Sequence, residues 1–83
     1  MDILDYQYMP IHMYYVRKIR LIDSRKNGLE YRKYGLSLDL IVENAKATPD
    51  SNAIDVINSS ISELDDQMSA LDTELASVNA LTE

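Results

Sequence analysis

Acidic side chains crowd the C-terminal third of this 83-residue sequence and are the first residues whose types could do chemistry. These side chains are Glu63, Asp65, Asp66, Asp72 and Glu74. Carboxylates act as catalytic acids or bases where a water-excluding pocket shifts their pKa values. The spacing here predicts the outside of a long helix, where no such pocket forms. Asp65, Asp66 and Asp72 therefore form a solvated face, or they contact a basic partner, as in an inhibitor that imitates the charge of nucleic acid.

A basic segment in the first half offers a second kind of chemistry. Residues 17–33 contain seven Lys or Arg residues against two acidic ones. Arginines interleaved with tyrosines can contact phosphates and stack on bases, which makes Arg17, Arg20 and Arg25 candidate partner contacts. The net charge of −6 for the whole chain opposes binding to a polyanion. The same segment can instead form the polar face of a helix, or an internal counter-charge to the acidic third.

Tyrosine and methionine are concentrated in the first fifteen residues. Such side chains are enriched where one protein grips another, and they can also cover the core of a small bundle. The candidate partner contacts in this segment are Tyr8, Met9, Met13, Tyr14 and Tyr15.

Motifs for enzymes, cofactors and metals are missing from the sequence. With only Gly28 and Gly35 available, no Gly-rich phosphate loop can be built. The chain has no cysteine and a single histidine, His12, so no metal-ligand spacing is present. We therefore expect no enzymatic activity, no cofactor and no small-molecule substrate.

The elements that must position these residues include a long helix near the C-terminus. Thr48 can cap it, Pro49 suits its first position, and Asp50 complements the positive end of the helix dipole. Beyond that turn, apolar residues alternate at gaps of three and four through four heptads, which predicts a coiled coil within or between chains. This interaction seam consists of Ile54, Ile57, Ile61, Leu64, Met68, Leu71, Leu75 and Val78.

The first half of the sequence predicts shorter helices. A helix that Pro10 either starts or kinks is expected over about residues 3–26, with Gly28 after its end. After a Gly-containing connector, a short helix near residues 38–46 would have one apolar face. That face consists of Leu38, Ile41, Val42 and Ala45.

An alternative for residues 13–42 is a β-hairpin that turns at Asn27-Gly28 and packs on the C-terminal helix. Helices are preferred because a helical projection of residues 13–22 separates apolar from charged side chains, whereas strand alternation mixes them.

The predicted fold is therefore all-α, a helical hairpin or small bundle with a long coiled-coil-like C-terminal helix. Residues 1–83 form a single domain, with a Tyr-rich basic half over 1–47 and an acidic heptad helix over 48–83. A fold-back within residues 27–48 would place the basic segment beside the acidic helix, so that charge selects the register. Because the last helix is longer than the other elements can cover, we expect another chain to bury part of the seam, in a homo-oligomer or a heteromer.

These features predict a small protein–protein interaction or assembly module that works through the heptad helix as an oligomeric structural subunit, adaptor or chaperone-like partner. The alternatives are an acidic inhibitor of a host protein and nucleic-acid binding through residues 17–33. The sequence shows no cleaved secretory signal and no apolar run of the ~20 residues that a membrane span needs. We expect a cytoplasmic protein, one exported without a cleaved signal, or one associated with a virion.

The turn "TPDSN" between two helices of a Cys-free acidic chain is similar in outline to needle and inner-rod subunits of type III secretion systems. The resemblance rests on the turn and the general build, and it implies an assembly subunit. No functional residues are carried over from it, and small phage structural or host-takeover proteins fit the same features.

Overall fold

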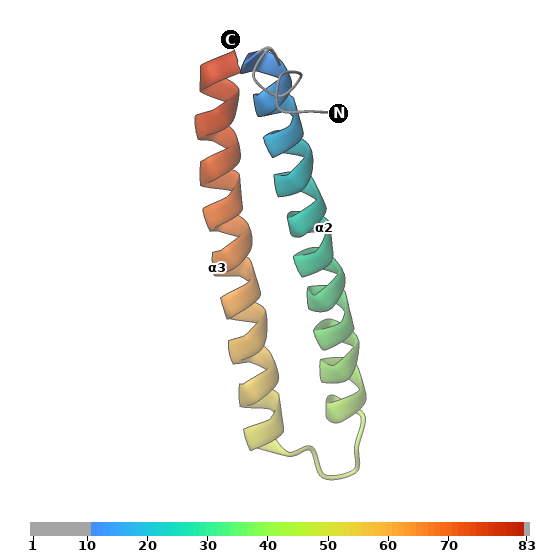
Figure 1. Cartoon of the computed structure of the whole chain (residues 1–83). Helices are drawn as coiled ribbons and strands as arrows, with labels where there is room; N and C mark the ends of the chain where they lie inside the picture. The colour runs from blue at the N-terminus through green and yellow to red at the C-terminus, as the bar shows by residue number, and fades with distance from the viewer. Residues whose placement is uncertain (1–10, 83) are drawn as a thin grey trace.

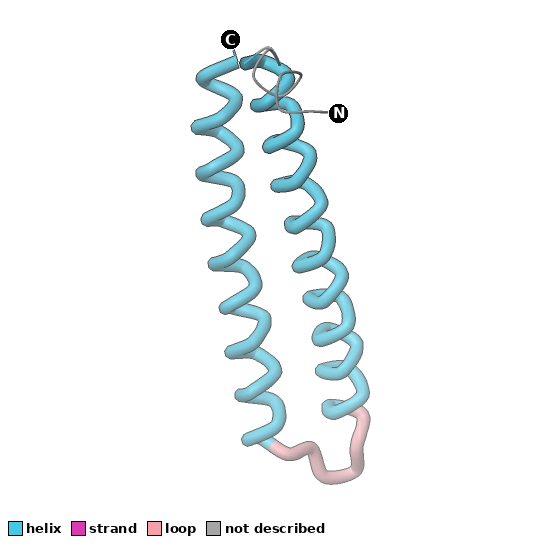
Figure 2. The backbone as a smooth tube through the Cα atoms, viewed as in Figure 1, coloured by secondary structure: helices cyan, strands magenta, loops and turns pink. Residues whose placement is uncertain are grey.

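Two long antiparallel helices make up the fold (Figure 1). The computed structural model describes the backbone of residues 11–82 and the side chains of residues 13–81. Helix α2 spans Ile11–Asn44 and helix α3 spans Ser51–Thr82, and residues 45–50 form the turn that joins them (Figure 2). The predicted all-α helical hairpin is confirmed. The β-hairpin alternative is wrong, because every residue from 13 to 42 is helical.

Helix α2 is longer and more continuous than the sequence predicts. The expected connector after residue 26 is wrong, since α2 runs without a break through residues 27–37. A glycine in a helix interior costs only about 1 kcal/mol relative to alanine, and neither Gly28 nor Gly35 has a positive φ that would end the helix. Packing on α3 offsets that cost. The expected start at residue 3 and the role of Pro10 lie outside the described residues.

The heptad seam of α3 faces α2 of the same chain. Leu64 and Val78 are buried, and the other six seam residues are half-buried. Helix α2 supplies a matching series at the same alternating gaps, all of it buried or half-buried. This series is Tyr15, Ile19, Ile22, Lys26, Leu29, Lys33, Leu36, Leu40 and Glu43. Because α2 is as long as α3, it covers the seam from end to end, and the reason for expecting another chain on the seam no longer holds.

The core between the two helices is thin. Among the described hydrophobic residues only Ile22, Leu29, Leu64 and Val78 are buried. A single pair of helices leaves the outward surface of each helix uncovered, so the hairpin has few apolar contacts to offset its chain entropy. Further burial against another surface would add directly to its stability.

Candidate functional site

Three ion pairs join the basic segment of α2 to the acidic residues of α3. They are Lys18 with Glu74 (Nζ to Oε1, 2.6 Å), Lys26 with Asp72, and Lys33 with Asp65 (Nζ to Oδ1, 2.7 Å). In each pair the hydrogen bond to the carboxylate raises the pKa of the lysine. The predicted placement of residues 17–33 beside the acidic helix is confirmed. Exposed pairs of this kind contribute little stability, so they act mainly on register and orientation.

Two of these lysines belong to the α2 series that packs against the seam. The side chains of Lys26 and Lys33 are 30% and 35% exposed, so their stems lie against the core while the ammonium groups reach its edge. Asp72 raises the pKa of Lys26 most strongly, and the nearby carboxylates of Asp23 and Glu30 raise it further. This edge of the hairpin therefore gathers carboxylates from both helices around the two lysines. A shifted register would separate Lys26 from Asp72 and Lys33 from Asp65.

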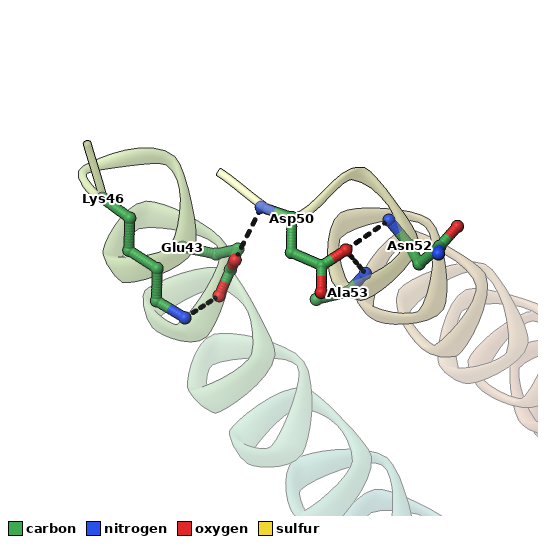
Figure 3. A network of polar contacts seen from close by, with 5 residues as sticks. All are labelled: Glu43, Lys46, Asp50, Asn52 and Ala53. Atoms are coloured by element: carbon green, nitrogen blue, oxygen red, sulfur yellow. Dashed lines mark hydrogen bonds and ion pairs between the residues drawn. The ribbon is translucent and has the colours of Figure 1, made fainter. Parts of the chain in front are cut away.

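Glu43 organises the turn between the helices (Figure 3). Its Oε1 accepts a hydrogen bond of 2.9 Å from the backbone N–H of Asp50, and its Oε2 lies 2.7 Å from Lys46 Nζ. The carboxylate of Asp50 in turn accepts hydrogen bonds from the backbone N–H groups of Asn52 (2.9 Å) and Ala53 (3.4 Å). Asp50 is thus the N-cap of α3, and Glu43 holds it in place.

The predicted cap at Thr48, with Pro49 as the first helical residue, is wrong. Both residues lie in the turn, and α3 begins at Ser51. The difference arises because Glu43, on the preceding helix, fixes the backbone of Asp50 and so makes its side chain the better cap.

The turn predicts a pH dependence of stability. The ion pair with Lys46, and then the N–H of Asp50, hold the pKa of Glu43 below its ordinary value of 4.5. A carboxylate with a lower pKa in the folded state stabilises the protein above pH 4.5, and this contribution is lost as the pH falls through the folded-state pKa. We expect Glu43→Gln to lower the Tm at pH 7 and to differ less from wild type near about pH 3. Thermal unfolding followed by circular dichroism checks this, and an equal Tm difference at both pH values would contradict it.

Helix α2 carries arginines that form no ion pair within the described hairpin, two of them at outward positions of the helix and two beside the groove that it forms with α3. Arg17, Arg20, Arg25 and Arg32 are exposed, and none of them forms an ion pair with another residue of the described chain. The first three are among the predicted partner contacts. The basic segment is therefore divided, with lysines directed to α3 and arginines left for other contacts.

A row of large apolar side chains continues towards the turn along the outer surface of α2, on the side away from α3. These residues recur at helical spacing on the face opposite the seam, and we call them the outer stripe. They are Tyr31 (80% exposed), Tyr34 (62%), Leu38 (63%), Ile41 (64%) and Val42 (63%). The sequence places the last three on the inward face of a short helix, whereas the continuous α2 turns them outward. A helical projection of the whole of α2 would have revealed them.

Two hollows lie in the groove between the helices, beside Arg25 and Arg32. Their volumes are about 450 and about 610 Å³, and Arg32 borders both of them. Gly28 and Gly35 lie along this groove, and their missing side chains leave it open. The groove is lined by polar side chains and by leucines of both helices, more of its surface is apolar than polar, and it is open to solvent, so it adds surface for contact rather than an enclosed site.

The predicted aromatic contacts near the N-terminus are only partly described. Met13 and Tyr14 are exposed, whereas Tyr15 belongs to the α2 series that faces the seam and is half-buried. The rings of Tyr14 and Tyr15 meet edge to face, with 5.4 Å between their centroids. Tyr8 and Met9 lie outside the described residues, as does the side chain of His12.

The predicted acidic contacts on α3 separate into two groups. Asp65 and Asp72 form ion pairs with Lys33 and Lys26, which leaves Asp66 as the exposed member of the three without an ion pair in the described chain. Asp55 and Glu63 are also exposed, and like Asp66 they form no ion pair or hydrogen bond within residues 13–81.

Comparisons with protein-family models, with curated proteins and with solved structures find no match. Within the described chain, neither helix has a segment long and apolar enough to cross a membrane. In the same residues no three His, Asp or Glu side chains are grouped so that they could hold a metal ion.

Proposed function

We propose that this protein is an assembly module that associates with another protein surface through the outer surface of α2. The observation that carries the proposal is the outer stripe, five large apolar side chains that a two-helix fold leaves exposed on one face. A contiguous apolar surface on a small protein is typical of an association site. Tyrosines at one end of the stripe and arginines beside it are the residue types most enriched at protein interfaces.

The heptad seam has a different role in this proposal from the one that the sequence suggests. It closes the hairpin, because α2 covers it along its length. Closing the hairpin holds α2 straight and presents the outer stripe on a rigid helix. The function remains that of a structural subunit, adaptor or chaperone-like partner, but the contact surface moves from α3 to the far side of α2.

Association should depend on the outer stripe. We expect wild type to show a mass above that of one chain in sedimentation equilibrium, and the double variant Leu38→Asp/Ile41→Asp to have the mass of a single chain. The reason is that association would bury two unpaired carboxylates. Because both side chains are exposed in the hairpin, the variant should keep the helical circular dichroism spectrum of wild type.

The matched control is Ala47→Asp/Thr48→Asp, which adds the same two charges at exposed sites in the turn, outside the stripe. It should associate like wild type. A wild-type chain that stays at single-chain mass over the whole concentration range, or a stripe variant that associates as wild type does, would contradict the proposal.

Nucleic-acid binding through residues 17–33 is a second candidate, favoured by the four arginines without an ion pair in the described chain and by the exposure of Tyr31 and Tyr34 on the same helix. Such binding would weaken steeply with salt. The net charge of −6 opposes it, which is why protein association is the function proposed first.

A further inference from the structure

We propose that the surface bound by α2 is the outer surface of α3 in a second copy of the chain. This inference rests on the proposed function, since the outer stripe forms part of the contact. The two outer surfaces lie on opposite sides of a flat hairpin measuring 63 × 26 × 14 Å, so they cannot meet within one chain. They can meet between copies, and they complement each other in charge, in side-chain size and in length.

Charge provides the first argument. Among the described residues, the arginines without an ion pair at outward positions of α2 are Arg17 and Arg20, and the acids without one at outward positions of α3 are Asp55 and Asp66. A single hairpin leaves both sets exposed without a counter-charge. A contact between the α2 surface of one copy and the α3 surface of the next brings the opposite charges together.

Side-chain size provides the second argument. Beyond its acidic part, and before the exposed Leu81, the outward positions of α3 carry small, uncharged and exposed side chains. These are Ser69, Ala70, Thr73, Ala76, Ser77 and Ala80. Small residues allow another helix to approach closely, and the bulky outer stripe of α2 supplies the side chains to fill such a surface.

A single register satisfies both arguments at once. When α2 of one copy runs parallel to α3 of the next with an offset of 38 residues, segment 17–25 lies beside segment 55–63, and the outer stripe, 31–42, lies beside 69–80. The same offset sets Asn44 level with Thr82, so the helices overlap along their whole length. An antiparallel arrangement that pairs 17–25 with 55–63 would set residue 31 level with residue 49, before α3 begins, and would leave the stripe uncovered.

The contact joins two different surfaces, so it does not close on itself in a pair. Each copy offers one α2 surface and one α3 surface that point in opposite directions. Heterologous contacts of this kind continue from copy to copy until they close a ring or form an open filament. The structure therefore points to an assembly of more than two copies rather than to a twofold dimer.

Two charge-reversed variants test the inference by sedimentation velocity at low ionic strength. We expect Arg17→Glu/Arg20→Glu alone, and Asp55→Lys/Asn58→Lys alone, to need at least about tenfold more protein than wild type to associate, because each opposes like charges in this register. An equimolar mixture of the two should associate at the wild-type concentration, since every contact in an alternating assembly regains opposite charges. The control Arg17→Lys/Arg20→Lys keeps the charge and should associate like wild type.

The outcomes separate this inference from the proposed function. If wild type associates and the Asp55→Lys/Asn58→Lys variant does so equally well, the outer surface of α3 is not in the contact, and the inference fails while the proposed function stands. A mixture that associates no better than its components also overturns the inference. Failure of wild type to associate at all overturns both. A contact that persists in the charge variants but is lost in Leu38→Asp/Ile41→Asp would place a different surface opposite the stripe.

Discussion

Leu64→Asp is expected to unfold the hairpin. Leu64 is 7% exposed and lies in the middle of the seam that α2 covers. An ionised carboxylate at this position would be buried without a partner, which costs several kcal/mol. That penalty is comparable with the whole stability of a small domain, about 5 kcal/mol at the lower end of the usual range. Circular dichroism at 25 °C should show the loss of most of the helical signal.

The control for this prediction is Ser62→Asp, which introduces the same charge at an exposed position of the same helix. It should retain wild-type helicity. If Leu64→Asp kept the spectrum and Tm of wild type and changed only the mass in solution, the seam would lie between chains. That result would restore the role for the seam that the heptad pattern alone suggests.

Gly28→Pro should produce the second large effect. Proline removes a backbone donor and clashes with the preceding turn of an interior helix, at a cost of about 3 kcal/mol or more. Gly28 lies in the unbroken middle of α2, next to the buried Leu29. A kink here would therefore also move part of α2 away from the seam of α3. We expect a large fall in the urea midpoint, read by circular dichroism.

Gly28→Ala is the matched control, and its effect should have the opposite sign. A Cβ added at Gly28 meets no atom within 4 Å, so alanine gains helix propensity of about 0.5–1 kcal/mol without a clash. Equal tolerance of proline and alanine would mean that the helix is interrupted at this residue, as the sequence-based connector requires.

The two helices differ in how readily the sequence predicts them. Every a and d position of α3 is apolar, so periodicity alone identifies its inward face. The same pattern in α2 is interrupted by Lys26 and Lys33, whose placement makes sense only beside Asp72 and Asp65 of the other helix. A property of the pair is not visible in either segment alone.

The turn predicted from the local sequence Asn27-Gly28 is wrong for a related reason. Asn27-Gly28 favours a hairpin turn in isolation, but these residues lie within a helix that packs on α3 over its whole length. Tertiary contacts on both sides of the dipeptide outweigh its local preference. Once α2 is continuous, Leu38, Ile41 and Val42 face outward, which is why the outer stripe could not be predicted from a model of short helices.

The division of the basic segment also depends on position rather than on residue type. Lys26 and Lys33 occupy inward positions and reach the acids of α3, whereas Arg17 and Arg20 occupy outward positions of the same helix. Charge counts along the sequence give the total but not this partition. The acidic helix is divided in the same way, because Asp65 and Asp72 form ion pairs with α2 whereas Asp66 forms none in the described chain.

The central claim is that each chain closes its own seam and so leaves its outer surfaces free for association. Carbodiimide coupling tests it most directly, because this reagent joins a lysine to a carboxylate only where the two are in contact. Chains with and without ¹⁵N are mixed, unfolded, refolded together and coupled, and the crosslinked peptides are analysed by mass spectrometry. We predict that each Lys33–Asp65 or Lys26–Asp72 crosslink joins two peptides that are either both ¹⁵N-labelled or both unlabelled, because both partners belong to one chain. Crosslinks with mixed labels in statistical proportion would show that the seam is shared between chains, and would contradict the account.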